Sequence, residues 1–348
     1  MRKNLTKKVS LLLALVMILS SFIVGCDRGG KTEQAPANNT TNSTQPSTDV
    51  EKLKLTIAGG SIGGAWAAIG EGVSEVIRRS YPGSEVAYEV GQEAANVAMV
   101  STNKVQLGVA HASFLKMASD GVEPFPKKLE NLRALAVLYG EAAEHFLILQ
   151  DAGITNFEDL KTKKYPLKIN FNTKDSFMEI VGKKTLEANG ITYEDIKSWG
   201  GNVDFMSMGS SIDLMRDGKI EAYSNVIQVP SSNIVDASSN LKLTLLPMSK
   251  EVQAKLNSEL GTYDAVISKD KYNFLTEDVP TVAAKVVLFT NAELSDAEAY
   301  AIVKSIDENL EYFTGIHSSL KGLTLETLQD VAPVELHPGA LKYYQEKK

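Results

Sequence analysis

The chain has 348 residues, of which 43% are hydrophobic and 23% are charged, and its formal net charge at pH 7 is −7. This composition is that of a globular chain of about two domains, and it excludes a collagen-like, disulfide-rich or wholly disordered protein. The acidic balance disfavours a nucleic-acid binder, because such proteins are usually basic. Only one apolar stretch approaches the length of a membrane span, which excludes a multi-span membrane protein.

The N-terminus has a basic start, an apolar run and then a glycine–cysteine pair, which is the order of a bacterial lipoprotein signal peptide. The basic residues are Arg2, Lys3, Lys7 and Lys8, and residues 9–24 carry no charge. We predict that residues 1–25 are cleaved off and that Cys26 carries a lipid that holds the protein on the outer face of the cell membrane. The alternative is an uncleaved single-span anchor, since the run is close to the short limit for a membrane helix. Both interpretations place the folded part outside the cytoplasm.

Residues 26–50 predict a disordered tether. Asn, Thr, Ser, Gln, Pro and Gly dominate the segment, and only alanine and valine add apolar surface. Such a composition cannot bury enough apolar area to offset the entropy lost on ordering.

The first predicted α/β domain spans residues 51–142. It opens with an alternating strand at 53–58, a glycine-rich turn at 59–64 and a helix over 65–80. This order points backbone N–H groups and a helix dipole at an anion. Because the glycines lack both the G-x-G-x-x-G spacing and a Walker loop, a turn that only packs the helix is an equal alternative. Further strands are predicted at 85–90, 105–110 and 132–139, and a loop at 91–96 leads into a helix that ends at Ser101.

The second predicted α/β domain spans residues 143–247. A short helix follows Thr155 and Glu158, which have the spacing of a capping box. A polar loop at 172–176 leads into a helix that ends near Asn189. Strands are predicted at 144–149, 167–171, 204–206, 220–224 and 241–246. Alternating strands and helices in both domains favour parallel sheets, which bind ligands at the carboxyl ends of their strands.

Residues 248–348 are interpreted as a return segment and C-terminal helices that pack mainly on domain 1. A strand is predicted at 282–289, and Ser295 and Glu298 are spaced to cap a long helix through Phe313. With hinges near 139–144 and 247–263, we expect the two domains to close on a ligand.

The sequence offers no catalytic or metal centre. The histidines are His111, His145, His317 and His337, and none has metal-ligand spacing. No G-x-S-x-G elbow is present, and no serine has an evident base. We interpret His145 as a packed core residue, His337 as part of a turn, Tyr343 and Tyr344 as packing residues, and Glu141 and Glu144 as solvated carboxylates. The prediction is a binding protein without a cofactor, not an enzyme.

Four stretches together resemble the TAXI family of solute receptors of TRAP transporters, from about Lys52 to the C-terminus. They read GGSIGGAWAAIGEGV, the 91–96 loop with KVQLGVAHAS, DSFMEIVGKKTLEANGI, and ELHPGALKYYQEK. The resemblance implies a two-domain, type-II periplasmic-binding-protein fold with the ligand cleft between the domains. It also implies a small organic acid, often glutamate or a dicarboxylate, that is delivered to a sodium-coupled TRAP membrane permease. A lipid-anchored ligand sensor that acts on a membrane signalling partner is the alternative on the same fold.

The chain departs from the family pattern at three places. Ala65–Trp66 stands where the family has two aromatic residues, and Glu93 stands where it has a serine. Asp175-Ser176-Phe177 replaces Gly-Ser-Gly. Glu93 would repel a carboxylate unless it points away or pairs with a ligand ammonium, which favours glutamate over a plain dicarboxylate.

The predicted ligand site uses dipoles rather than cations. No arginine lies in the candidate loops, and Lys174 is their only cation. We expect backbone amides at Gly63, Gly64 and Ser176 to take most of the negative charge. Side chains of Ser61, Asn96, Ser176 and Asn225 would complete the shell, Trp66 would cover an apolar or ammonium face, and Glu93 would meet an amine. The receptor is expected to act as a monomer.

Overall fold

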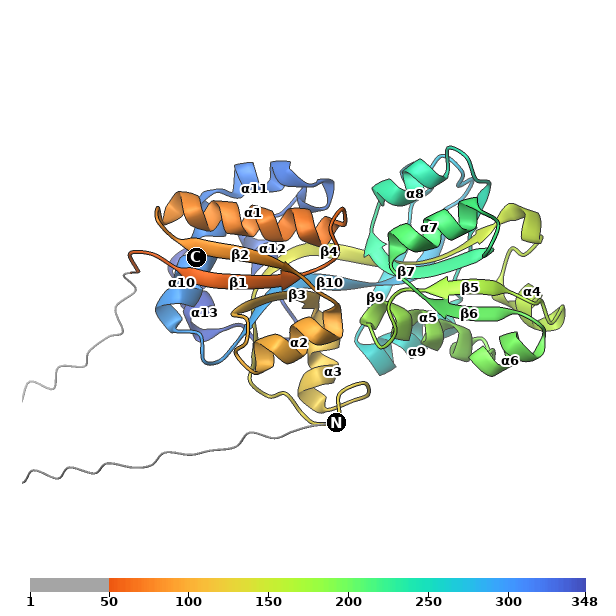
Figure 1. Cartoon of the computed structure of the whole chain (residues 1–348), viewed down its shortest axis with the longest axis horizontal. Coiled ribbons are helices and arrows are strands. Elements are labelled where there is room, and N and C mark those ends of the chain that lie inside the picture. The colour runs from red at the N-terminus through yellow and green to blue at the C-terminus, as the bar shows by residue number, and fades with distance from the viewer. Residues whose placement is uncertain (1–49) are drawn as a thin grey trace, which may run out of the picture. The chain divides into compact units, whose positions relative to one another are not determined.

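A computed structural model describes residues 50–348 of the chain. The predicted signal peptide 1–25, Cys26 and nearly all of the predicted tether lie outside the described residues. Within 50–348, no helix combines the length and apolarity that a membrane crossing requires. Two lobes share a sheet of ten strands in which the order is β2-β1-β3-β10-β4-β7-β5-β6, with β8 beside β4 and β9 beside β10 (Figure 1).

The first lobe holds one of the two parallel ends of this sheet, where β1 pairs in parallel with both β2 and β3. The C-terminal helices pack against the same lobe, where α10 contacts α1 and α13, and α12 contacts β4. Its elements are β1 (Lys54–Gly59), α1 (Ala65–Ser80), β2 (Glu85–Val90), α2 (Glu93–Ser101), β3 (Leu107–His111), α3 (Ala112–Asp120), α10 (Asp296–Glu308), α11 (Leu310–Ile316), α12 (Leu325–Leu328) and α13 (Pro338–Glu346).

Two long antiparallel strands, β4 (Leu132–Leu149) and β10 (Val279–Asn291), run through both lobes (Figure 1). The two strands predicted at 132–139 and 144–149 are therefore one, and exposed Gly140 and Glu141 mark its middle. The return between the lobes is made by β10, which has pairing irregularities around Ala284 and Val286. The segment 247–263, where the sequence predicts a second hinge, is mostly helix α9, and the buried residues Val252, Leu256 and Leu260 of this helix belong to the core cluster of the first lobe.

The second lobe packs apolar residues on both sides of its part of the sheet. Here β5 pairs in parallel with β6 and β7, and β7 runs antiparallel to β4. The elements are α4 (Phe157–Thr162), β5 (Lys168–Phe171), α5 (Phe177–Ala188), α6 (Tyr193–Ser198), β6 (Asn202–Phe205), α7 (Met208–Arg216), β7 (Ala222–Gln228), α8 (Ser232–Ala237), β8 (Leu243–Leu245), α9 (Lys250–Leu260) and β9 (Tyr263–Ile267). Ile267 and Tyr272 belong to the core cluster formed with α7 and β8, so part of 248–348 packs on this lobe and not on domain 1.

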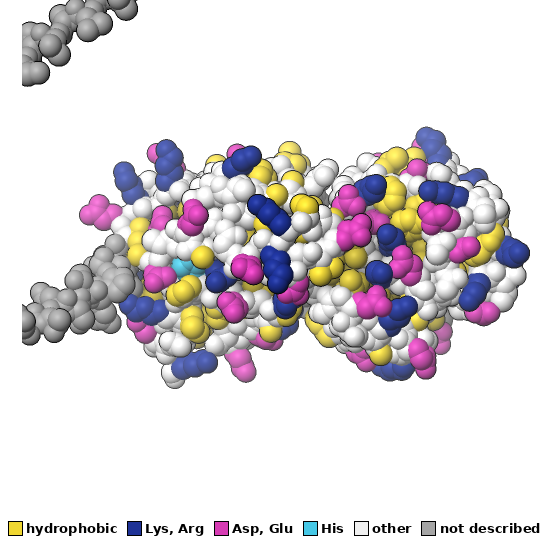
Figure 2. Space-filling model, turned by 90° about the horizontal axis from the view of Figure 1, so that it is seen from below, with side chains coloured by type: hydrophobic (Ala, Val, Ile, Leu, Met, Phe, Trp, Pro, Cys, Tyr) yellow, Lys and Arg dark blue, Asp and Glu magenta, His cyan; other side chains and the backbone are white. Residues whose placement is uncertain are grey.

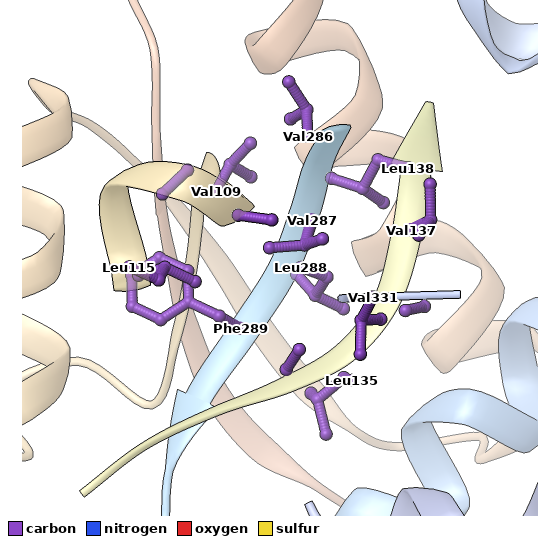
Figure 3. Packing of buried hydrophobic residues seen from close by; sticks show 14 of the residues in the cluster. Val109, Leu115, Leu135, Val137, Leu138, Val286, Val287, Leu288, Phe289 and Val331 are labelled. Carbon is purple, nitrogen blue, oxygen red and sulfur yellow. The ribbon is translucent and has the colours of Figure 1, made fainter. Parts of the chain in front are cut away.

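The core of the first lobe is centred on β10 and β4. Val286, Val287, Leu288 and Phe289 are consecutive in β10, and all four are fully buried among β3, α3 and β4 (Figure 3). Such uninterrupted apolar runs are typical of strands covered on both faces. The two crossing strands therefore form the centre of the first-lobe core.

Several local predictions are confirmed and others are wrong. The capping box at Ser295 and Glu298 forms, and His145, Tyr343 and Tyr344 are buried in the core. Asn156, not Thr155, caps α4 by accepting the Asp159 N–H at 2.8 Å. His337 does not shape a turn but caps α13, and Glu144 is buried rather than solvated.

Acidic and basic side chains alternate over the face of the protein shown in Figure 2, without a large field of one sign. This mixture agrees with the moderate net charge of −7.

Candidate functional site

A cleft of ≈ 980 Å³ lies between the lobes, at the carboxyl ends of the parallel strands. Its first-lobe wall comes from residues 60–68 and from Tyr88, Glu93 and Tyr139, and its second-lobe wall from the loops that follow β5, β6 and β7. A hollow of ≈ 640 Å³ over β1 and β2 lies instead at the amino ends of the strands, beside Lys54 and Glu85. Because open α/β sheets bind ligands at the carboxyl ends of their strands, the first is the candidate site.

The glycine-rich turn between β1 and α1 forms one wall of the cleft. Gly63 has a φ of +83°, a conformation that glycine adopts without strain. Gly64 is the N-cap of α1, no side chain caps this helix, and its first turn has no acidic residue. The Gly64 N–H donates to the Ser61 carbonyl at 3.1 Å. The helix dipole and the uncapped N–H groups at the start of α1 still favour a negative group at this turn.

Tyr88 supports the turn from behind. Its hydroxyl donates to the Gly60 carbonyl at 2.8 Å. A Cβ at Gly59 or at Gly70 would meet the Tyr88 side chain at 2.4 or 2.5 Å, so both positions require glycine for this contact. The sequence analysis missed Tyr88, since its role depends on the pairing of β1 with β2.

Trp66 is part of the cleft lining. Its Nε1 donates to the Tyr139 hydroxyl at 2.9 Å, and its ring centroid is 5.4 Å from that of His111. Burial raises the pKa of Tyr139, so its hydroxyl stays protonated and the pair orients the indole ring. Trp66 thus presents a fixed aromatic side chain to the cleft.

Glu93 borders the cleft, but its carboxylate is already engaged by the protein. Oε1 accepts the His111 backbone N–H at 2.8 Å and lies 2.8 Å from His111 Nδ1. Oε2 accepts the Phe177 N–H at the start of α5, at 3.0 Å. Three of the roughly four acceptor positions of the carboxylate are thus used within the protein, which does not support the prediction that Glu93 pairs with a ligand amine.

Asn96 and Ser176 lie behind the cleft rather than in it. Asn96 Nδ2 donates to the carbonyls of Gly59 and Val109 at 3.0 and 3.3 Å, which ties β1 to β3. Ser176 Oγ caps α5 by accepting the Glu179 N–H at 3.3 Å. Neither residue is part of the cleft lining, so their predicted contact with a ligand is not supported.

Asn225 lines the cleft, together with residues that the sequence analysis missed. Its Oδ1 accepts from Asn172 Nδ2 at 3.1 Å. Ser207 and Ser231, the N-caps of α7 and α8, also reach the cleft, and neither makes a side-chain capping bond. A serine before a short helix was the available signal, but the sequence cannot tell which helices begin at the cleft.

The described lining contains no lysine or arginine. Lys174 is not part of the lining. The titratable side chains of the lining are those of Glu71, Tyr88, Glu93, Tyr139 and His317. Desolvation lowers the pKa of His317 below its usual range, which favours the neutral ring at pH 7. The cleft therefore offers an anion N–H and O–H dipoles rather than a side-chain cation.

The described residues form no metal cluster of three or more His, Cys, Asp or Glu side chains. One serine does lie beside a histidine, since Ser319 Oγ is 2.8 Å from His317 Nδ1. The same nitrogen accepts the Ser319 backbone N–H, so the pair caps the short 3-10 helix Ser318–Leu320.

The two-lobed α/β fold is that of two-domain periplasmic binding proteins, as predicted. MatC from Rhodopseudomonas palustris with bound malate is similar at a TM-score of 0.53 and 13% identity, over 85% of this chain and 96% of that one. The periplasmic binding protein BugD is similar at a TM-score of 0.52 and 12% identity, over 85% and 93% of the two chains. Residues 57–347 match the NMT1-like family, and the chain belongs to this family.

Proposed function

We propose that this protein is an extracytoplasmic solute receptor that binds a small organic acid or an acidic amino acid such as glutamate and releases it unchanged. The observation that carries the proposal is the cleft of ≈ 980 Å³, which both lobes line and onto which the uncapped start of α1 opens. The volume suits a small molecule. The similar structure of MatC holds malate, an acid of this class.

One carboxylate of the ligand would lie at the turn of Gly63 and Gly64, against the N-terminus of α1. Trp66 would pack on the carbon chain, and Asn172 and Asn225 would supply amide groups from the second lobe. The buried positions of Asn96 and Ser176 assign them to the support of these walls. Closure would bend β4 near Gly140, since the exposed pair Gly140 and Glu141 lies between the two packed halves of the strand.

The receptor would belong to the TAXI type and deliver its ligand to a sodium-coupled TRAP permease. The sequence stretches from Lys52 to the C-terminus support this assignment. Recovery of the ligand unaltered after incubation with the pure protein would separate a receptor from an enzyme.

We expect Cys26→Ser to move the protein from the membrane fraction to the soluble fraction, because residue 26 would then carry no lipid. Fractionation followed by intact-mass measurement of the mature chain checks this. Retention of the variant in the membrane with residues 1–25 still attached would show that a helix, not a lipid, is the anchor.

Trp66 provides a direct readout of ligand binding. The chain has two tryptophans, Trp66 in the cleft and Trp199 against the core cluster of β5 and β6. Titration with L-glutamate or L-malate should change the tryptophan emission of the wild type and of Trp199→Phe. Trp66→Phe should lose most of that change. If Trp66→Phe kept the whole signal, the ligand would bind elsewhere. A ligand at a hundred times its Kd should also stabilise the fold by about 2.7 kcal/mol.

A further inference from the structure

Ser231 is an N-cap serine whose hydroxyl does not cap its helix. Serines at this position usually accept an N–H of the first turn, as Ser249 and Ser295 do for α9 and α10. Ser231 precedes α8, is 1% exposed, and its Oγ has no hydrogen-bond partner among residues 50–348. The residue lines the cleft. A buried hydroxyl without a partner lowers stability, so its presence calls for a group that is not part of the protein.

A buried chain of hydrogen bonds holds the Ser231 backbone in place. Its N–H donates to the Tyr272 hydroxyl at 2.8 Å, and that hydroxyl lies 2.8 Å from His145 Nε2. His145 Nδ1 lies 2.8 Å from the Ala143 carbonyl. Burial lowers the pKa of His145 to about 4, so the ring is neutral, Nδ1 donates to Ala143, and Nε2 accepts from Tyr272. The backbone N–H of Ser231 is thus used, and only the hydroxyl is left over.

The second-lobe lining around Ser231 carries no charged side chain and combines polar residues with apolar ones such as Met208 and Ile227. Ser207, Asn225, Gln228 and Asn233 line the cleft on the same lobe. Helix α7, of nine residues, begins there with no side-chain cap and no acidic residue in its first turn. The dipole of α7 favours an anionic oxygen at this place. Because no cation lines the cleft, neutral N–H and O–H donors would bind that oxygen.

We propose that Ser231 is a ligand-recognition residue of the second lobe, whose hydroxyl donates to an oxygen of a second carboxyl group on the ligand. The inference rests on the proposed function of the same cleft. The first carboxylate would lie at the turn of α1 and the second at Ser231, so the cleft selects acids with two carboxyl groups over those with one.

The test compares Ser231→Ala with Ser249→Ala, a cap that is not part of the cleft. Melting temperatures are measured without ligand, and calorimetry follows the binding of L-glutamate and L-malate. Ser231→Ala should bind the acid that the wild type binds about ten- to a hundredfold more weakly. It should melt at or above the wild-type temperature, because no protein bond is lost. Ser249→Ala should melt a few degrees lower and keep wild-type affinity.

Three results would overturn the inference. If the wild type bound an acid and Ser231→Ala bound it equally well, the assignment of Ser231 would fail while the proposed function stood. If the wild type bound neither acid, the proposed ligand class would fail and this inference with it. A fall in the melting temperature of Ser231→Ala as large as that of Ser249→Ala, with unchanged affinity, would show that the hydroxyl is structural.

Discussion

Replacement of Glu93 by glutamine is expected to lower the free energy of unfolding by about 3 kcal/mol. The carboxylate is 2% exposed and lies within hydrogen-bond distance of three N–H groups. Charge-assisted hydrogen bonds are worth about 1.5–3 kcal/mol each. A glutamine amide cannot accept at both ends, so it leaves either the Phe177 N–H or His111 facing an NH₂ group in a buried place.

The same substitution should loosen the contact between the lobes. Glu93 begins α2 of the first lobe, whereas Phe177 begins α5, which packs on β5 and β7 of the second. The carboxylate therefore stands at the α5 N-terminus where the sequence predicted a ligand carboxylate. Small-angle scattering of ligand-free Glu93→Gln should show a larger radius of gyration than that of the wild type.

Glu71→Gln is the matched control for Glu93→Gln. Glu71 also lines the cleft, but it is exposed. Its substitution removes one carboxylate from the cleft without removing a buried acceptor, and we expect a change in stability within about 0.5 kcal/mol. Equal stability of the two variants in urea unfolding would contradict the role of Glu93 as an interlobe contact.

The second large effect concerns Glu144 and pH. Burial raises the pKa of Glu144 from its usual 4.5 to about 8. Its Oε1 accepts the Ser224 hydroxyl at 2.6 Å, and Oε2 has no partner within residues 50–348. The folded protein therefore keeps a proton on Glu144 that the unfolded chain releases above pH 4.5. This group favours the folded state fully below pH 4.5, and the advantage is lost as pH rises toward 8.

The neighbouring His145 has the opposite dependence. Burial lowers its pKa from 6.5 to about 4, so its contribution is lost as pH falls from 6.5 toward 4. Between pH 4.5 and 6.5 the two slopes cancel. Above pH 6.5 only the pH dependence due to Glu144 remains. It lowers the free energy of unfolding by about 1.4 kcal/mol per pH unit up to pH 8.

We therefore expect Glu144→Gln to gain stability relative to the wild type as pH rises from 4.5 to 8, by about 4 kcal/mol in total. Urea unfolding of both proteins at pH 5, 6.5 and 8 measures the difference. Glu141→Gln, at an exposed position three residues away, should follow the wild-type curve. A constant difference between Glu144→Gln and the wild type across this range would show that Glu144 is ionised in the folded protein.

The local patterns of the sequence predicted the elements that depend on neighbours along the chain. The strand, glycine turn and helix at 53–80 form as expected, because alternation, glycine and 3.6-residue spacing act over a few residues. The capping box of Ser295 and Glu298 also depends only on residues close together in the sequence. Helix α3 and strand β9 were missed, and β4 was divided in two at Gly140, where a glycine next to a charged residue looks like the end of a strand.

The sequence by itself determined the two-lobed α/β class, the turn at Gly63 and Gly64, and the absence of an arginine from the candidate loops. Only the tertiary structure decided what the polar side chains do. Glu93 meets its partners 18 and 84 positions further along the chain, and Ser231 meets Tyr272 41 positions away. Hydrogen bonding between groups so far apart in the sequence depends on how strands and helices pack. The local spacing of residues therefore does not predict it. A glutamate or a serine can therefore contact a ligand or form a hydrogen bond within the protein, depending on the direction in which the fold orients its side chain.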